Sequence, residues 1–540
     1  MSTQELNLPQ SVATIPESAD LKRVAPKEKS SSTSDLIVKY KDKLKGVLSC
    51  YDRIVLTGNL YPLCFPQGAT NFLYRQHLRI FDYVKFAEPL RDEIVTAIET
   101  LAKDNGLAIE WVTPETGRKE ARIQAILKMR GTQPGLVHIF AAMERCRIYK
   151  PWHDKSSHKT YLKAARSQCK HYYVYFIDPD LGLCYLRVPT YCPFRLQFYF
   201  NGHVWLAQQL TAQGIAFQLV DYAFVDIADF EQANILAAQL DLKALHAKLD
   251  EYARRYCPPV KSLNLTCKWG ILQTEYATDL VFKDPAALQA FYPHLLELLI
   301  LAVKPADIAT FLGRKLHGNF QGAVESRLNP VRPFGTRIKH ALGRVSLKRY
   351  DKFGVILRIE TTVNDVAFFR QYRQVHHRTG KASKEWAPLL KSLYGLRPLR
   401  GLLEAANQRY LKFLTALDTP EVGVRLLHHV AETVTEKEHR YKGFNLLAHA
   451  DATVLRVLVR GEFTIAGFTN KNLRALLSDQ TSGQASRLLK RLRVRGLIRK
   501  VGKRYKYYLT DLGRQVATMA LKLRETCVIP TLAQTAKTVA

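Results

Sequence analysis

Five acidic residues stand directly beside predicted strands or in the turns that join them: Asp52, Asp178, Asp180, Glu360 and Asp365. Enzymes that cleave phosphodiesters with Mg²⁺ hold the ion with two or three carboxylates from separate strands, because Mg²⁺ prefers hard oxygen ligands and activates water. These five residues are therefore the candidates for catalysis, with Asp52 and Glu360 as the Mg²⁺ ligands. A cofactor is expected only if the protein is an enzyme, and it would then be Mg²⁺.

The same acids also have a purely structural interpretation. Asp178 and Asp180 lie in an Asp-Pro-Asp-Leu-Gly segment, where aspartate accepts backbone hydrogen bonds and shapes a turn. Arg53 and Arg358 stand close in sequence to other acids and could pair with them. The sequence leaves both interpretations open.

A tyrosine stands among cations in the segment Ser346–Lys352, and the next predicted strand carries Arg358-Ile359-Glu360. This short stretch resembles initiators of rolling-circle replication, in which a basic strand ending in Tyr-Asp/Asn-Lys precedes an Arg-aliphatic-Glu strand. The resemblance implies Tyr350 as a nucleophile on DNA and Glu360 as a metal ligand. The family's His-hydrophobic-His metal motif has no clear counterpart here.

A phenol with a pKa of about 10 needs neighbouring cations such as Lys348 and Lys352, or a metal, to act as a nucleophile at neutral pH. In the alternative interpretation, Lys348 and Lys352 bind backbone phosphates, while Tyr350 stacks on a base or fills the core.

Two cysteines and three histidines form a third cluster in the sequence: Cys146, His153, His158, Cys169 and His171. These residue types are zinc ligands, and four of them would complete a tetrahedral site. No CxxC or HxxxH spacing accompanies them, which argues against zinc. Lysines and Trp152 surround the two middle histidines, so this segment equally describes a phosphate-binding loop.

The elements that must position these residues are strands in clusters, separated by helices. Strands are expected at 51–60, 171–177, 183–188 and 196–200, and a second block at 336–363. Helical periodicity appears at 87–105, 119–130, 203–213, 230–256, 285–302 and 386–440. This pattern predicts an α+β body, or an α/β sheet with long insertions.

Composition and pattern together predict six regions. They are a disordered tail (1–34), a basic mixed α and β part (35–260), a second strand-rich part with a basic hairpin (261–385), a helical connector (386–446), a DNA-binding domain (447–525) and a flexible tail (526–540).

Three short helices and two strands are expected near the C-terminus. The third helix, Gln484–Arg495, would bury Ala485, Leu488, Leu489 and Leu492 and would be followed by strands at 497–501 and 505–509. The run Ser486–Arg493, then Gly496-Leu497-Ile498, then Tyr508–Arg514 resembles the MarR-like winged helix-turn-helix family.

That resemblance implies a third helix in the major groove and a wing against the backbone. Eleven Lys/Arg and a single acid lie between Thr481 and Arg514, as DNA contact requires. The expected contacts are Gln484, Ser486, Arg487, Lys490, Arg491, Arg493, Lys500, Lys503, Arg504 and Lys506. A winged helix that binds protein is the alternative.

The whole chain carries 80 Lys+Arg against 48 Asp+Glu, a net charge of +32, with 47% hydrophobic residues. A core of that size excludes global disorder, so the charge must cover folded surfaces that attract polyanions. Basic and aromatic residues also interleave at 145–161 and 187–200, a composition that suits single strands or RNA.

The sequence lacks a signal peptide and a membrane-spanning run, and its nine cysteines have no paired spacing. We therefore expect no membrane contact and a bacterial cytoplasmic, nucleoid-associated protein, with a homodimer as one arrangement. Three functions remain open: a regulator or mobile-element factor that binds duplex DNA, a Mg²⁺-dependent nuclease, nickase or transposase-like enzyme, and an RNA-binding component.

Overall fold

The computed structural model describes residues 21–23, 35–113, 118–290, 292, 303–316, 323–329, 337–377, 380–417, 420–477, 480–501 and 505–533. The chain forms two compact units, Met1–Thr415 and Ala416–Ala540. We call them the N-terminal and the C-terminal unit and describe each by itself.

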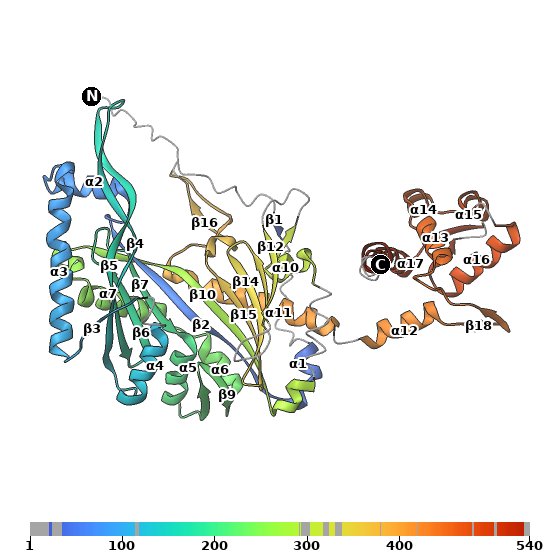
Figure 1. Cartoon of the computed structure of the whole chain (residues 1–540), viewed down its shortest axis with the longest axis horizontal. Coiled ribbons are helices and arrows are strands. Elements are labelled where there is room, and N and C mark those ends of the chain that lie inside the picture. Colours follow the sequence, from blue (N-terminus) through green and yellow to red (C-terminus); the bar gives the residue numbers. More distant parts are fainter. Residues whose placement is uncertain are drawn as a thin grey trace. The chain divides into compact units, whose positions relative to one another are not determined.

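One eleven-stranded sheet organises the N-terminal unit (Figure 1). Across the sheet its strands are β12 (Val324–Asn329), β13 (Arg337–Leu342), β14 (Val345–Lys352), β15 (Ile356–Val363), β10 (Thr266–Phe282), β2 (Leu44–Tyr61), β7 (Leu196–Asn201), β6 (Gly182–Pro189), β5 (Lys159–Asp178), β4 (Gly135–Asp154) and β3 (Ile109–Trp111). All neighbouring pairs are antiparallel except β3 and β4. The fold is therefore mixed α and β with clustered strands, as the sequence predicts.

Helices cover both faces of this sheet. On one face, α7 (Leu242–Tyr256) places Tyr252 against Phe176 and Phe198. Helix α11 (Leu396–Leu417) is joined to the sheet by Asn407, which binds β10 and β15. Because side chains alternate along a strand, the neighbours of these residues point the other way. We call that other face, which carries Arg358 and Glu360, the polar face.

The polar face is covered in part by three helices. Helix α4 (Lys119–Arg130) packs its Ile123 with Tyr173, Tyr175 and Tyr185 of the sheet. Helix α5 (Gly202–Ala212) begins directly after β7 and brings His203 toward Arg358. A third helix on this side, α6 (Phe230–Ala237), contacts β2.

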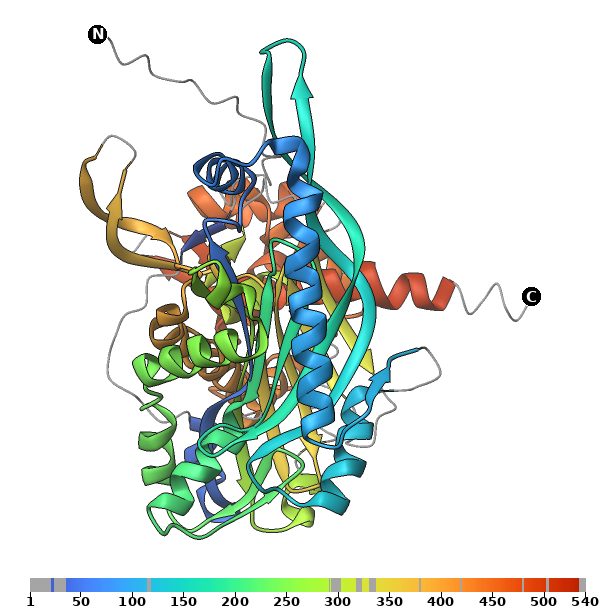
Figure 2. The ribbon, with the colours of Figure 1, turned by 90° about the vertical axis from the view of Figure 1, so that its left-hand side faces the viewer.

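Two β-hairpins extend beyond the sheet (Figure 2). One is the far end of β4 and β5, where Trp152 is exposed and Lys163 lies 4.2 Å from its ring centroid. The other pairs β16 (Arg370–His376) with β17 (Ala382–Pro388) and exposes Tyr372 and Trp386.

The remaining helices of the N-terminal unit are α1 (Asp35–Lys39), α2 (Pro66–Arg75), α3 (Tyr83–Asp104), α8 (Pro259–Ser262) and α10 (Pro305–Phe311). A small sheet pairs β1 (Leu21–Arg23) with β11 (Arg314–Leu316), and another pairs β8 (Phe217–Val220) with β9 (Ala223–Ile227).

The C-terminal unit contains α12 (Pro420–Ala431), β18 (Val434–Glu436), β19 (His439–Tyr441), α13 (His449–Leu458), α14 (Gly461–Ala466), α15 (Asn470–Leu476), α16 (Ser482–Val494), β20 (Ile498–Val501), β21 (Lys506–Leu509) and α17 (Asp511–Leu523). Thr481 and Gln484 form a capping box at the start of α16, which fixes where that helix begins. Leu488, Leu489 and Leu492 of α16 join a single apolar core with residues of α13, α15, β20 and α17.

The elements of the structure cross several of the predicted region boundaries, and non-local pairing explains why. The boundary at 260/261 crosses one continuous sheet, because β10 pairs with β2 on one side and β15 on the other. The helical connector 386–446 is divided, since α11 lies largely in the N-terminal unit and β18 and β19 pair as strands.

The two predicted tails are described only in part. Of the tail 1–34, only 21–23 lie within the described residues, and they form β1. In the tail 526–540, the described residues are helical rather than irregular as far as 533. Most of the helix predicted at 285–302 lies outside the described residues. Within the described chain, no helix has both the length and the apolar character needed to cross a membrane.

Asn407 of α11 is fully buried and joins that helix to the sheet. Its Nδ2 donates to the carbonyls of Tyr276 and Ile359, and its Oδ1 accepts from the Thr361 hydroxyl at 2.7 Å. We predict that Asn407→Leu lowers the free energy of unfolding by about 2 kcal/mol or more, because buried partners are left unpaired. The exposed control Lys412→Ala on the same helix should change it by less than about 0.5 kcal/mol in urea denaturation; equal effects would contradict this role for Asn407.

Candidate metal centre on the polar face

Three carboxylates from three neighbouring strands converge on the polar face. They are Asp52 of β2, Glu275 of β10 and Glu360 of β15, and one oxygen from each lies within 4.8 Å of the others. Among the described residues this is the one such cluster of potential metal ligands. The sequence predicted Asp52 and Glu360 together, and the structure brings them together.

A buried arginine holds the centre in place. Arg358 of β15 is 1% exposed; its Nε and Nη2 donate to the two oxygens of Asp279 at 2.7 and 2.6 Å. Its Nη1 donates to Asp52 Oδ2 at 2.8 Å. One guanidinium thus connects β15 to β10 and β2, with both acids on separate nitrogens.

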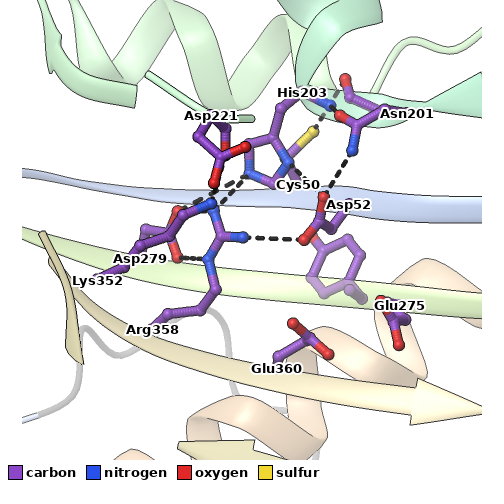
Figure 3. A network of polar contacts seen from close by, with 12 residues as sticks. Cys50, Asp52, Asn201, His203, Asp221, Glu275, Asp279, Lys352, Arg358 and Glu360 are labelled. Atoms are coloured by element: carbon purple, nitrogen blue, oxygen red, sulfur yellow. Dashed lines mark hydrogen bonds and ion pairs between the residues drawn. The ribbon is translucent and has the colours of Figure 1, made fainter. Parts of the chain in front are cut away.

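A second group of polar side chains surrounds Asp52 (Figure 3). Asn201, at the start of α5, donates from Nδ2 to Asp52 Oδ1 at 2.8 Å. The ring of His203 is fully buried, with Nδ1 3.4 Å from Asp52 Oδ1 and Nε2 3.8 Å from Asp279 Oδ2. In Figure 3, Glu275 and Glu360 lie on the opposite side of Asp52 from His203.

Lys348 and Tyr350 of β14 occupy the other side of the cluster. Lys348 Nζ lies 2.5 Å from Glu360 Oε1 and 3.0 Å from Glu275 Oε1, and the Tyr350 hydroxyl donates to Glu360 Oε2 at 2.7 Å. The Thr362 hydroxyl also donates to Glu275 Oε1 at 3.2 Å. Glu275 Oε2 has no hydrogen-bond partner within the described residues.

The cluster combines a well-paired acid with a poorly paired one. Burial opposes ionisation of Asp52, but Arg358, His203 and Lys352 outweigh it and hold its pKa well below the usual range. Burial, followed by repulsion from Glu360, instead raises the pKa of Glu275, and Lys348 offsets this only in part. The centre therefore carries negative charge that the surrounding cations do not fully compensate.

These residues fit a hard divalent cation. Two oxygens on opposite sides of Mg²⁺ lie about 4.2 Å apart, since each bond is about 2.1 Å long. Adjacent oxygens on the same ion lie about 3.0 Å apart. The three carboxylate oxygens, which lie within 4.8 Å of one another, would therefore move closer together on binding, and Lys348 would leave the two glutamates. Carboxylate oxygens have spare lone pairs, so the bonds from Arg358 and Asn201 do not prevent Asp52 from coordinating an ion.

The other predicted acids lie elsewhere. Asp178 faces α7, where it accepts from Lys248 Nζ and the Tyr252 hydroxyl, so it is on the face opposite the cluster. Asp180 pairs with the same lysine. Asp365 caps a short 3-10 helix by accepting from Ala367 N. Asp178 also accepts backbone hydrogen bonds in the turn, as the structural interpretation of Asp178 and Asp180 anticipated, whereas the sequence did not indicate the capping role of Asp365.

The surroundings of Tyr350 differ from those expected of a nucleophile. Burial and the Glu360 carboxylate raise its pKa well above the ordinary value, which favours the protonated phenol. Lys352 is buried, with its Nζ on the carbonyl of Asp221, and Lys348 is half-buried and bound to the two glutamates. In this arrangement both lysines bind groups of the protein itself.

The five candidate zinc ligands are spread along the β4–β5 hairpin. Cys146 and His153 are seven residues apart in one strand, a separation of about 23 Å at about 3.3 Å per residue. His153 bonds the Thr160 hydroxyl, and His158 lies at the tip of the hairpin. Cys169 and His171 lie near Cys146, so the set divides into two groups and makes no single site.

Most residues expected to contact DNA lie on the surface of the C-terminal unit. Gln484, Ser486, Arg487 and Arg493 of α16 are exposed, although Gln484 Oε1 also caps the helix and Ser486 Oγ accepts from Asn470. The side chains of Lys500 and Lys506 lie beside Tyr505 and Tyr508. Lys503 and Arg504 lie outside the described residues.

Two residues of α16 make internal contacts instead. Arg491 donates to the carbonyls of Lys442 and Gly443, pairs with Asp451 and lies 3.7 Å from the Phe444 ring centroid. Lys490 pairs with Glu436 at 2.5 Å. Arg491 therefore stabilises the unit itself, which the outward face of a predicted helix could not reveal.

Sequence reasoning missed Glu275 because it missed β10. The run Thr266–Phe282 alternates β-branched and aromatic residues with polar ones, which is a usable strand signal. Phe194 and Phe198, which lie in the segment 187–200 where basic and aromatic residues interleave, are fully buried, so these two rings belong to the core.

Comparison with known proteins gives no assignment. No protein-family model and no curated protein matches the chain. Among solved structures, the chain shows 11% identity to the class II 3-hydroxy-3-methylglutaryl-CoA reductase of Streptococcus pneumoniae, with 85% of this chain and 80% of that one covered. The TM-score is 0.18, and so weak a likeness carries no argument about fold or function.

The opposite pKa directions of Asp52 and Glu275 predict opposite effects on stability. A carboxyl whose pKa is lowered by folding stabilises the fold at pH values above its pKa in the unfolded chain, about 4. This stabilisation is lost as the pH falls toward the lower pKa of the folded state. We predict that Asp52→Asn lowers the free energy of unfolding at pH 7 by about 3 kcal/mol, because it breaks a buried ion pair.

Glu275 should behave in the opposite way, because a raised pKa means that folding disfavours its ionised form. In metal-free buffer at pH 7, Glu275→Gln should leave the free energy of unfolding unchanged or raise it. Urea denaturation of both variants measures this, and the Asp52→Asn deficit should narrow below pH 4. Equal losses at pH 7 would refute the distinction between a well-paired acid, Asp52, and a poorly paired acid, Glu275.

Proposed function

We propose that the protein binds DNA and cleaves it in a reaction that depends on a divalent cation held by Asp52, Glu275 and Glu360. The convergence of these three carboxylates from separate strands carries the proposal. The raised pKa of Glu275 supports it, since an acid that folding disfavours is more typical of a functional site than of a stabilising ion pair. A bound Mg²⁺ would supply Lewis acidity and activation of water.

The residues around the carboxylates have separable roles in this proposal. Lys348 lies where its ammonium can balance negative charge that develops on a phosphate beside the glutamates. Tyr350 orients Glu360 through its hydroxyl and is a positioning residue. Arg358 and Asn201 bind the two oxygens of Asp52 and so hold this carboxylate in position to coordinate the cation with Glu275 and Glu360.

Binding to duplex DNA is assigned to the C-terminal unit, which we propose is a MarR-like winged helix. The order of α13, α15, α16, β20, β21 and α17 supports this, as does the buried stripe on α16. Arg487 and Arg493 extend from the exposed side of α16. A major-groove helix presents such residues to base edges and phosphates.

Cleavage can be tested on supercoiled plasmid with Mg²⁺ and with EDTA. Glu275→Gln and Glu360→Gln should each lower the rate at least about 100-fold, because each removes a charged ligand. The acid Asp180 lies outside the cluster, so Asp180→Asn should cleave like the wild type. If the wild-type protein binds the plasmid but does not cleave it with Mg²⁺, the nuclease proposal is refuted and the function as a DNA-binding regulator remains.

Tyrosine substitution distinguishes hydrolysis from tyrosine attack. Because Tyr350 acts through Glu360, we predict that Tyr350→Phe reduces cleavage no more than about 10-fold and raises the Mg²⁺ concentration needed for half-maximal rate. No protein–DNA adduct should appear on a denaturing gel. An adduct that disappears in Tyr350→Phe would reinstate the nucleophile.

The role of α16 can be tested with the full chain on sites selected from random duplexes. Arg487→Ala should weaken the selected site more than unrelated DNA, whereas Arg493→Ala should weaken both alike and reduce the salt slope by about 0.9. Arg491→Ala should chiefly lower stability, because its contacts are internal. Equal losses on all DNA from Arg487→Ala and Arg493→Ala would contradict base reading by Arg487.

A further inference from the structure

A cavity lined by arginines lies on the same face of the sheet as the carboxylates. Its volume is about 190 Å³. Its charged and polar lining comprises Thr57, Arg145, Cys146, Arg147, His171, Arg187, Arg195 and Gln197. No acidic residue is part of that lining.

Positive charge in this cavity is only partly balanced. Arg187 pairs with Glu144 through Nε and Nη2 at 3.0 and 2.5 Å. Arg195 donates to the Thr57 hydroxyl, a neutral partner, and Arg145 and Arg147 have no carboxylate partner among the described residues. Of the four arginines that line the cavity, one is paired with a carboxylate, that of Glu144, so the lining carries an excess of positive charge.

The pKa directions of two lining residues agree with this excess of positive charge. Partial burial, then Arg147 and Arg187, lower the pKa of Arg195. Burial and Arg187 lower the pKa of His171 to about 4, so the ring is neutral at pH 7 and can accept or donate a hydrogen bond. Such surroundings favour the entry of an anion.

A row of contacts connects the cavity to the carboxylates. Gln197 donates to the Tyr185 hydroxyl, Tyr185 stacks on Tyr199, and the guanidinium of Arg53 lies 5.3 Å from the Tyr199 ring centroid. Arg53 directly follows Asp52 in β2, so this row of contacts ends at the carboxylate cluster. All four residues of this row lie on the polar face.

Strand geometry sets the distance between the two sites. Leu272 lines the cavity, and Glu275 is three residues further along β10, about 10 Å away at about 3.3 Å per residue. Along β2, Thr57 and Asp52 are five residues apart, about 17 Å. At about 3.4 Å rise per nucleotide, these distances correspond to about three to five nucleotides.

We propose that this cavity binds a backbone phosphate of the nucleic-acid strand whose cleavage is assigned to the carboxylate centre, a few nucleotides from the scissile bond. The position of this phosphate relative to the scissile bond rests on the proposed function, whereas the binding of a phosphate in the cavity does not. Arginine recognises phosphate by paired N–H donors, and four of them around a small cavity provide both charge and geometry. The subsite would set the register of the strand on the polar face.

Cys146 provides a reporter inside the cavity. Its thiol is half-buried, free of disulfides, and its pKa is lowered by a hydrogen bond with Cys169, against burial, and by Arg187. A thiol with a lowered pKa reacts faster with iodoacetamide near neutral pH. A phosphate bound beside it should slow that reaction.

The test uses the full chain with Glu360→Gln, which prevents cleavage, and a single-stranded DNA oligonucleotide. We expect Arg147→Gln and Arg195→Gln each to weaken binding about 3- to 30-fold and to reduce the slope of log K against log salt by about 0.7, the value for one single-strand phosphate. Lys103→Gln, an exposed cation at the end of α3, is the control and should change neither quantity. Slopes equal to the control in both variants would overturn the subsite.

Alkylation of Cys146, followed by peptide mass spectrometry, gives a second readout. The oligonucleotide should slow it at least about 5-fold in the Glu360→Gln chain and much less when Arg195→Gln is added. Protection by inorganic phosphate that the oligonucleotide does not exceed would assign the cavity to a free anion and overturn the strand subsite.

The two proposals fail separately. If the wild-type chain shows no Mg²⁺-dependent cleavage but Arg147→Gln and Arg195→Gln still reduce the salt slope of binding, the enzyme proposal is refuted and the phosphate subsite is retained. Intact cleavage with unaltered slopes would refute the subsite and retain the enzyme.

Discussion

The arrangement of the N-terminal unit depends on one buried guanidinium. Arg358 is 1% exposed and binds Asp279 of β10, the neighbouring strand, and Asp52 of β2, the strand beyond it. Removing one partner of such a group leaves an uncompensated buried charge, which costs about 3–5 kcal/mol. The register of β15, β10 and β2 must therefore keep Arg358 paired with Asp279 and Asp52. That same register places Glu275 and Glu360 beside Asp52.

Stability and function divide among these acids. Asp52 and Asp279 neutralise Arg358, whereas Glu275 and Glu360 share the single cation Lys348. The second pair would be more stable with one carboxylate protonated or with a further cation bound. A divalent ion would relieve that excess of negative charge. On the same face, the arginine-lined cavity has the opposite imbalance, so the two sites would attract the metal and the phosphates of one substrate complex.

Local pattern predicted much of this fold and less of the site. Strands such as 183–188 and the helix 119–130 follow from alternation and periodicity, and the buried stripe of α16 follows from helical spacing. The pairing of β10 with β2 and β15 joins segments far apart in sequence, which no local signal specifies. Glu275 was missed for that reason, and Asp178 was proposed although it faces α7. Asp52 and Glu360, each an acid beside a buried strand, lie in one cluster because β2 and β15 are both central strands of the sheet.

The central claim is that Asp52, Glu275 and Glu360 bind one divalent cation. Crystals of the full chain soaked in Mn²⁺ test it directly through anomalous scattering. The account predicts a single strong anomalous peak on the polar face, with one oxygen of each carboxylate about 2.0–2.3 Å from it and Lys348 moved aside or turned toward solvent. Mn²⁺ bound only at other sites, with Lys348 still on both glutamates, would contradict the claim.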